Sequence, residues 1–128
     1  MLKRSSKIGI VGLGLLGGSY AKGFYNAGYQ VVGIDIDEET IEYARNMRWI
    51  VEGGSEPSLI SDCDVVIFAV YPKIFVQWIK DNQQYLKSGI IISDVTGIKR
   101  GIVSEINSIL REDVEFIACH PMAGREYK

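Results

Sequence analysis

The chain has 128 residues, enough for one domain with a real core, and its 47% apolar and 23% charged residues are ordinary values for a globular protein. A net charge of −2, with scattered basic residues, argues against a nucleic-acid or anionic-membrane partner. No apolar stretch approaches the roughly 20 residues that cross a bilayer, and Met1 to Ser6 lacks the apolar region of a secretory signal. We therefore expect a cytoplasmic protein, with Cys63 and Cys119 as buried free thiols rather than a disulfide.

Strand-like and helix-like segments alternate along the chain. Apolar runs predict strands over Ile8–Val11, Gln30–Asp35, Asp64–Val70, Ile90–Ser93 and Val114–Cys119. Helical spacing predicts helices over Leu15–Ala27, Glu38–Met47, Ile74–Leu86 and Ile98–Leu110. Asp37 is suited to cap the second helix, residues 53–57 indicate a loop, and Pro57–Ser61 indicates one short helical turn. This alternation is typical of βαβ units, so we expect an α/β fold with a doubly wound, mostly parallel sheet.

A glycine-rich turn joins the first predicted strand to the first predicted helix. Gly12 allows the tight turn, Gly14 lets the backbone approach a pyrophosphate, and Gly17 lets the helix pack closely on the sheet. The helix start at Leu15 and Leu16 then turns free N–H groups and a positive dipole end toward the phosphates. With its flanking strand and helix, the turn predicts a dinucleotide site rather than a turn that binds no ligand.

The end of the second predicted strand indicates which dinucleotide is bound. Asp35 comes about 20 residues after the glycine turn, where a carboxylate accepts hydrogen bonds from the ribose 2′- and 3′-hydroxyls. Its charge opposes a 2′-phosphate, and Ile36, Asp37 and Glu38 follow it instead of an arginine. We therefore expect residues 1–128 to form a Rossmann-type domain that binds NAD rather than NADP, and we expect no metal site.

The ends of the later strands supply further candidates, because ligands of such sheets lie beyond the carboxyl ends of the strands. After the third strand, the candidates for covering the cofactor are Ala69, Val70, Tyr71 and Pro72. Pro72 fits equally well as a strand terminator and first residue of the next helix. After the last strand, His120 is the only histidine of the chain. A neutral imidazole there can take a hydroxyl proton as hydride leaves for NAD.

Three motifs of the sequence are the run His120-Pro-Met-Ala-Gly124, the segment Asp94-Val-Thr-Gly-Ile-Lys99 and the glycine turn. Together they resemble motifs of the prephenate dehydrogenase family: its His-Pro-Met-Ala-Gly signature, its Asp-x-x-Ser-Val-Lys segment and its phosphate loop. The resemblance implies NAD-dependent oxidative decarboxylation of prephenate to 4-hydroxyphenylpyruvate, a step of tyrosine biosynthesis. It gives His120 the role of bonding the substrate's ring hydroxyl and taking its proton. Arogenate dehydrogenase and a non-catalytic NAD-binding regulatory module are the alternatives.

The chain departs from the family pattern at Gly97, where the family often has a serine that contacts the substrate hydroxyl or the histidine. Thr96 is the candidate to supply that hydroxyl, or it caps the following helix, and the two interpretations stay open. Asp94 is expected to anchor its loop. Lys99 fits a phosphate or substrate contact as well as a solvated lysine, and Arg125 is a candidate partner for a substrate carboxylate.

The resemblance also implies a second part of the enzyme. Members of the family continue into a helical domain that closes the substrate pocket and forms a dimer, and residues 1–128 contain no such segment. We therefore expect this chain to be the cofactor-binding half of a larger homodimeric enzyme with a small-molecule substrate. Alone, it is expected to bind NAD but to turn over prephenate poorly or not at all.

Overall fold

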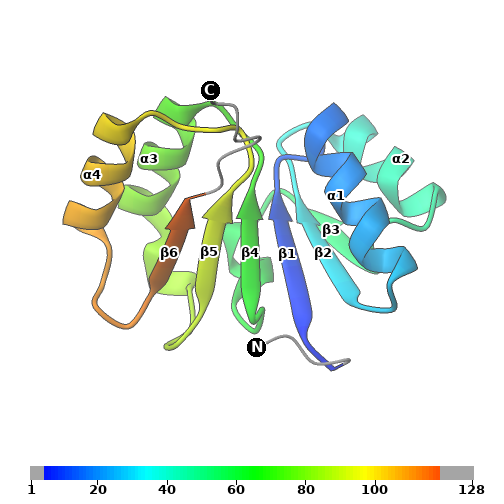
Figure 1. Ribbon diagram of the computed structural model, residues 1–128. Helices are drawn as coiled ribbons and strands as arrows, with labels where there is room; N and C mark the ends of the chain where they lie inside the picture. Colours follow the sequence, from blue (N-terminus) through cyan, green and yellow to red (C-terminus); the bar gives the residue numbers. More distant parts are fainter. Residues whose placement is uncertain (1–4, 119–128) are drawn as a thin grey trace.

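Six parallel strands form one sheet in the order β3-β2-β1-β4-β5-β6 in the computed structural model, which describes residues 5–118 (Figure 1). The strands are β1 (Lys7–Val11), β2 (Gln30–Ile34), β3 (Glu52–Gly54), β4 (Val65–Phe68), β5 (Ile91–Asp94) and β6 (Glu115–Ala118). The chain runs outward from β1 to β3, then returns to place β4 on the other side of β1. This reversal is the switch point of a doubly wound sheet, and it confirms the predicted fold class.

Helices cover both faces of the sheet (Figure 1). They are α1 (Leu15–Asn26), α2 (Glu38–Asn46), α3 (Pro72–Asn82) and α4 (Arg100–Ile109), with 3₁₀ turns η1 (Pro57–Ile60) and η2 (Gln83–Tyr85). α1 and α2 bury Ala21 and Ile41 in one apolar cluster, whereas α3 and α4 bury Phe75 and Ile106 in the other. Within residues 5–118, no helix has the length and apolar character that crossing a membrane requires.

The central strands are buried on both faces, as continuous apolar runs in a parallel sheet predict. Ile8, Ile10 and Val66 have no exposed surface, and neither has Phe68. Phe68 packs on Phe75, with ring centroids 4.6 Å apart. The core thus holds β1 and β4 rigidly at the switch point, so the loops that leave their carboxyl ends start from fixed positions.

Two local predictions are confirmed and one is corrected. The Asp37 side chain caps α2 by accepting a hydrogen bond from Glu39 N at 3.2 Å, and Pro57 begins the short turn η1. The loop expected from residue 53 instead contains β3, which pairs with β2 through Gly53 and Gly54. A strand of Glu-Gly-Gly has no apolar pattern, and a Cβ on Gly53 would lie 2.6 Å from a side-chain carbon of Ile50. Glycine is therefore required in β3 by close packing, which the pattern of apolar residues does not indicate.

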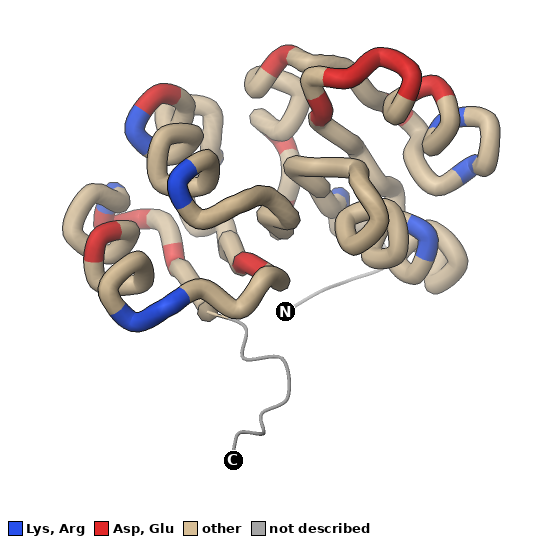
Figure 2. Tube along the Cα trace, turned by 90° about the horizontal axis from the view of Figure 1, so that it is seen from above, with Lys and Arg blue, Asp and Glu red and all other residues tan. Residues whose placement is uncertain are grey.

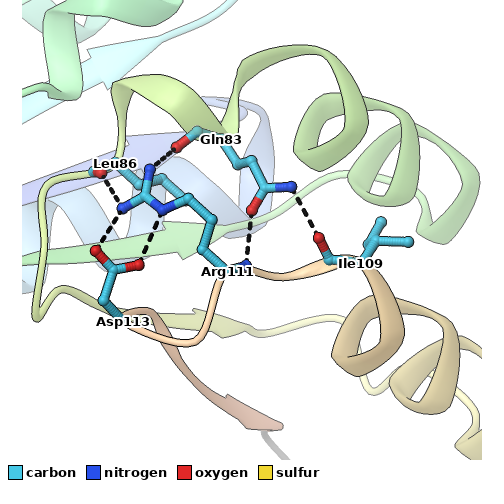
Figure 3. A network of polar contacts seen from close by, with 5 residues as sticks. All are labelled: Gln83, Leu86, Ile109, Arg111 and Asp113. Atoms are coloured by element: carbon cyan, nitrogen blue, oxygen red, sulfur yellow. Dashed lines mark hydrogen bonds and ion pairs between the residues drawn. The ribbon is translucent and has the colours of Figure 1, made fainter.

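Arg111 ties the 3₁₀ turn η2 and the residue after it to the α4–β6 connection at the amino end of the sheet (Figure 3). Its guanidinium donates to the carbonyl oxygens of Gln83 and Leu86, both at 2.7 Å, and forms a two-pronged pair with Asp113. The Gln83 side chain completes the link by accepting from Arg111 N at 3.0 Å and donating to Ile109 O at 2.8 Å. This network lies at the opposite edge from the strand ends where a ligand is expected.

Candidate functional site

A cavity of about 400 Å³ lies at the carboxyl edge of the sheet, at the switch point between β1 and β4. Four connections, those after β1, β2, β4 and β5, contribute to its wall. The lining residues are Gly12, Gly14, Leu16, Asp35, Ala69, Val70, Tyr71, Ile74 and Thr96. The fold therefore brings together most of the candidates that the sequence places at separate strand ends.

The three glycines of the turn are needed for different structural reasons. Gly12 has φ +95°, and a Cβ there would lie 2.6 Å from Ala69 O. A Cβ on Gly17 would lie 1.7 Å from Gly12 O, so only glycine lets α1 approach the turn this closely. Gly14 is different, because a Cβ there would meet no atom of residues 5–118 within 4 Å. The backbone at Gly14 is thus bare on a side that no described protein atom occupies, as close approach of a ligand requires.

The amino end of α1 is left open toward this region. Gly14 is its N-cap, no side chain among the described residues caps it, and its first turn contains no acidic residue. The first N–H groups of a helix lack partners within the helix and carry the positive end of its dipole, so such an end binds anions. Leu16 lines the cavity, whereas the 97% exposed side chain of Leu15 lines a neighbouring hollow between α1 and α2.

Asp35 is anchored by the backbone and keeps acceptor capacity. Its Oδ2 accepts from Leu13 N at 2.8 Å and its Oδ1 from Asp37 N at 2.9 Å. Each carboxylate oxygen can accept a second hydrogen bond, which suits a pair of neighbouring hydroxyls. Acidic residues gather at the β2–α2 turn, since Glu38 and Glu39 follow Asp37 (Figure 2). This local negative charge disfavours an additional phosphate on the ribose.

The segment after β4 forms the other wall of the cavity. Val70 and Tyr71 line it, and the Tyr71 side chain is 78% exposed. Pro72 does not line the cavity: it starts α3, with Tyr71 as N-cap. Ile74, in the first turn of α3, also lines the wall, although it was not among the site candidates from the sequence. The sequence contained one signal for this position: Ile74 lies two residues after Pro72, which is suited to start a helix. A side chain in the first turn of that helix lies close to the end of the preceding strand.

The loop after β5 is organised by Asp94. This buried residue accepts hydrogen bonds at Oδ1 from Thr96 N (2.9 Å), Gly97 N (3.0 Å) and the Thr96 hydroxyl (3.2 Å), so it anchors the loop as expected. Thr96 does not cap the next helix, because α4 begins at Arg100 with Lys99 as N-cap. The capping interpretation is therefore wrong. Gly97 has φ +73°, a left-handed conformation that serine adopts only with strain.

Several predicted residues lie outside the described residues. They are Cys119, His120 with the rest of its motif, and Arg125. β6 is described to Ala118, which pairs in register with Asp94.

Groups with shifted pKa values lie at the opposite, amino edge of the sheet. Hydrogen bonding to Lys87 and to the backbone of Lys7 lowers the pKa of Asp64, and hydrogen bonding to Lys7 lowers that of Asp62. Burial raises the pKa of the Cys63 thiol to about 12, so this thiol is unreactive at neutral pH. The lowered pKa values of Asp62 and Asp64 reflect favourable contacts that hold the amino edge, away from the cavity.

Another hollow, of about 450 Å³, lies on α1. The described residues that line it are Ser19, Tyr20, Gly23, Phe24, Ala27 and Tyr29. None of them carries a charge at neutral pH, and none follows the carboxyl end of a strand. The groups suited to a phosphate and a ribose are therefore those at the strand ends.

Comparison with known proteins gives a consistent family assignment. Residues 21–128 match the family model described as the prephenate dehydrogenase nucleotide-binding domain. A prephenate dehydrogenase of Lactococcus lactis subsp. cremoris (strain MG1363) is 33% identical over 123 residues, covering 92% of this chain and 34% of the relative. The chain thus spans about a third of the length of that curated relative.

Solved structures agree in fold. Prephenate dehydrogenase from A. aeolicus, in complex with hydroxyphenyl propionate and NAD⁺, superimposes with a TM-score of 0.83 at 27% identity, covering 94% of this chain and 43% of that one. Synechocystis arogenate dehydrogenase gives a TM-score of 0.82 at 25% identity, covering 89% of this chain and 40% of that one.

Proposed function

The chain belongs to the prephenate dehydrogenase nucleotide-binding domain family, and we propose that it is the NAD-binding part of an enzyme that oxidatively decarboxylates prephenate to 4-hydroxyphenylpyruvate. The observation that carries the proposal is the cavity at the switch point. There the bare backbone of Gly14, the uncapped start of α1 and the two remaining acceptor positions of Asp35 converge. A pyrophosphate fits the first two and a ribose diol fits the third.

The groups around the cavity and His120 have distinct roles in the proposed reaction. The α1 N–H groups hold the phosphates, Asp35 holds the ribose, and the wall after β4 shields the cofactor from water. Bound NAD supplies the hydride acceptor. His120, by family resemblance, takes the proton of the ring hydroxyl as the C–H bond of the same carbon breaks. The resulting carbonyl draws electrons into the ring, the ring carboxylate leaves as CO₂, and the aromatic product recovers a proton on its oxygen.

Direct titration tests the cofactor assignment. We expect NAD⁺ and NADH to bind the 128-residue chain, and NADP⁺ to bind at least tenfold more weakly, because a 2′-phosphate would face Asp35 and its acidic neighbours. Isothermal titration calorimetry with the three nucleotides gives these affinities. Equal affinity for NAD⁺ and NADP⁺ would contradict the role of Asp35, and binding of neither would contradict the nucleotide site itself.

Turnover belongs, in this proposal, to an enzyme that joins this domain to a helical domain, as a cytoplasmic homodimer. The length of the relatives supports a further domain, since this chain covers 34% of the L. lactis protein. The partly uncovered sheet face also supports it: Ile117 of β6 is 49% exposed on the face that α1 and α2 cover over β1 and β2. NADH formation from prephenate, measured with the 128-residue chain and with a chain as long as the relatives, tests this. Equal activity from both would overturn it.

Arogenate is the second candidate substrate, supported by the likeness to the Synechocystis arogenate dehydrogenase. The two substrates share the reacting ring and differ in the side chain, where prephenate has a keto group and arogenate an amino group. The ratio of kcat/KM for the two compounds decides between them. His120→Asn separates both from a regulatory module, because loss of the base collapses turnover while NAD binding persists.

A further inference from the structure

Asp94 is a buried carboxylate directly behind the cavity wall. It is the last residue of β5, pairs in register with Phe68 and Ala118, and has 1% of its surface exposed. Burying a charge is unfavourable unless hydrogen bonds replace the lost water. Anchoring a loop does not require that charge, because asparagine or serine also accepts hydrogen bonds from backbone N–H groups. The presence of a carboxylate at this position therefore needs a further explanation.

The two oxygens of Asp94 have very different surroundings. Oδ1 accepts from Thr96 N, Gly97 N and the Thr96 hydroxyl, at 2.9, 3.0 and 3.2 Å. Oδ2 is buried and accepts no hydrogen bond from residues 5–118. Within residues 5–118, the carboxylate is thus hydrogen-bonded at one oxygen only, and the one side chain of that range that it holds is Thr96. In such low-dielectric surroundings, hydrogen bonds to a charged acceptor are strong and polarise their donors.

This contact fixes the polarity of the Thr96 hydroxyl. A carboxylate oxygen without a proton only accepts, so the hydroxyl hydrogen points at Asp94. The remaining lone pairs of Oγ1 are then free to accept, and the exposed Thr96 lines the cavity together with Gly12 and Asp35. We propose that Asp94 is a positioning residue: it orients and polarises the Thr96 hydroxyl so that Oγ1 accepts a hydrogen bond from an N–H or O–H group of the bound ligand.

The ligand group is defined by its chemistry, a hydrogen-bond donor at the end of the cavity formed by the β5 loop. This inference rests on the proposed function, which offers two sources of such a donor. One is the carboxamide N–H of the nicotinamide, and the other is the ring hydroxyl of the substrate. Binding of the cofactor and turnover of the substrate distinguish the two sources.

The first experiment compares Thr96→Val with Thr96→Ser in the 128-residue chain, using NAD⁺ and ADP-ribose as probes. ADP-ribose keeps the phosphates and the adenosine but lacks the nicotinamide. If the carboxamide is the donor, valine weakens NAD⁺ binding about tenfold, leaves ADP-ribose binding unchanged, and serine keeps both near the wild-type values. Loss of NAD⁺ affinity in the serine variant equal to that in the valine variant would overturn the proposal, since serine retains the acceptor.

The second experiment tests Asp94 through Asp94→Asn, with Asp64→Asn as the matched control. Asp64 also accepts a backbone N–H, from Lys7, but lies at the amino edge of the sheet. We expect Asp94→Asn to lower the same quantity as Thr96→Val, which is NAD⁺ affinity if the carboxamide is the donor and kcat/KM for prephenate if the ring hydroxyl is the donor. The expected loss is about three- to tenfold, because a neutral acceptor polarises the hydroxyl less. Asp64→Asn should leave it unchanged. Equal effects of the two asparagine variants would overturn the positioning role, and so would an Asp94→Asn variant that binds and reacts like the wild type.

The substrate source is tested in an enzyme of the relatives' full length. If the ring hydroxyl is the donor, Thr96→Val leaves NAD⁺ affinity unchanged and lowers kcat/KM for prephenate about tenfold, and serine restores it. Unchanged NAD⁺ affinity together with unchanged kcat/KM overturns the inference. The Thr96 variants also decide the question if Asp94→Asn does not fold. Failure of the proposed function shows separately, as a wild-type chain that binds neither NAD⁺ nor ADP-ribose.

Discussion

At the scale of single residues, Gly14 and Gly17 are expected to be glycine for different reasons: Gly14 for approach of a ligand and Gly17 for packing of α1. An added Cβ meets no described atom at Gly14 but lies 1.7 Å from Gly12 O at Gly17. Gly14 also has φ −66°, which alanine adopts without strain. We therefore expect Gly14→Ala to keep the free energy of unfolding within about 0.5 kcal/mol of the wild type and to weaken NAD⁺ at least tenfold. Gly17→Ala should lower that free energy by more than about 2 kcal/mol.

The control for these variants is Gly23→Ala, in the middle of α1, where a Cβ also meets no described atom within 4 Å. Alanine there should raise the free energy of unfolding by about 0.5–1 kcal/mol through helix propensity and leave NAD⁺ binding unchanged. Urea denaturation and calorimetric titration measure the two quantities. Unchanged NAD⁺ affinity in Gly14→Ala would show that the phosphates bind elsewhere.

Asp35 carries the second prediction at this scale. Asp35→Ala removes both acceptors for the ribose diol and also the anchor of Leu13 N. We expect NAD⁺ affinity to fall about 10- to 100-fold and the preference for NAD⁺ over NADP⁺ to narrow, because the charge that opposes a 2′-phosphate is lost. Asp81→Ala, an exposed acidic residue on α3, is the control and should change neither affinity. Equal losses for NAD⁺ and NADP⁺ would indicate that Asp35 acts only through the loop.

Site residues that follow from topology were predictable, and those that depend on loop conformation were not. Gly12, Asp35 and Val70 line the cavity because parallel strands end at one edge, which the apolar runs already indicate. Ile74 was missed because α3 starts at Pro72, so its first turn reaches the cavity. Of the two open interpretations of Thr96, the helix cap was wrong because Gly97 turns left-handed and the helix begins only at Arg100. The spacing of apolar residues does not predict such backbone geometry, namely the residue at which a helix starts or a positive φ angle.

At the scale of elements, strong periodicity predicted helices and strands well, and their ends less well. The expected helix over Ile74–Leu86 is observed as α3 from Pro72 to Asn82, followed by the 3₁₀ turn η2. The last strand, expected over Val114–Cys119, is described as Glu115–Ala118. β3 could not be found by pattern, because its pairing with β2 is made by backbone groups and Gly53 leaves room for the side chains of Ile50 and Ile41.

The end of α2 gives a prediction for this scale. Arg48 has φ +60°, and the bonds from Arg48 N to Arg45 O and from Trp49 N to Ala44 O form the helix-ending motif that favours glycine at this position. We expect Arg48→Gly to raise the free energy of unfolding by about 0.5–1 kcal/mol, since relief of left-handed strain exceeds the entropy cost of glycine. Arg48→Ala removes the same side chain without relieving the strain, so it should not stabilise. Urea denaturation of both variants checks this.

The Arg111 network joins elements that are distant in sequence and makes a second prediction for this scale (Figure 3). Lysine has no planar fork and cannot serve Asp113 and the carbonyls of Gln83 and Leu86 together. Arg111→Lys should therefore lower the free energy of unfolding by about 1–3 kcal/mol. Arg100→Lys, exposed at the start of α4, should change it by less than about 0.5 kcal/mol. Equal stabilities of the two lysine variants would show that the network contributes nothing.

At the scale of the whole molecule, the two edges of the sheet are chemically different. At the carboxyl edge, polar groups keep spare capacity: the α1 start is uncapped, Asp35 has acceptor positions left, and Asp94 Oδ2 has no partner among residues 5–118. At the amino edge, Asp62 and Asp64 are paired with Lys7 and Lys87. Groups suited to binding a ligand therefore gather where the strands end, and ion pairs hold the edge where they begin.

The ion pairs of the amino edge make the stability of the molecule depend on pH. Hydrogen bonds from Lys87 and from Lys7 N lower the pKa of Asp64 below its ordinary value of 3.8. A carboxyl whose pKa is lower in the folded state stabilises the fold above the unfolded pKa, and this contribution is lost as the pH falls through the folded pKa. Asp64→Asn should thus cost about 1 kcal/mol at pH 7, and the difference from the wild type should shrink below pH 4. Urea denaturation at pH 7 and pH 3 measures it, and a difference that stays constant would assign the effect to the Lys7 backbone bond alone.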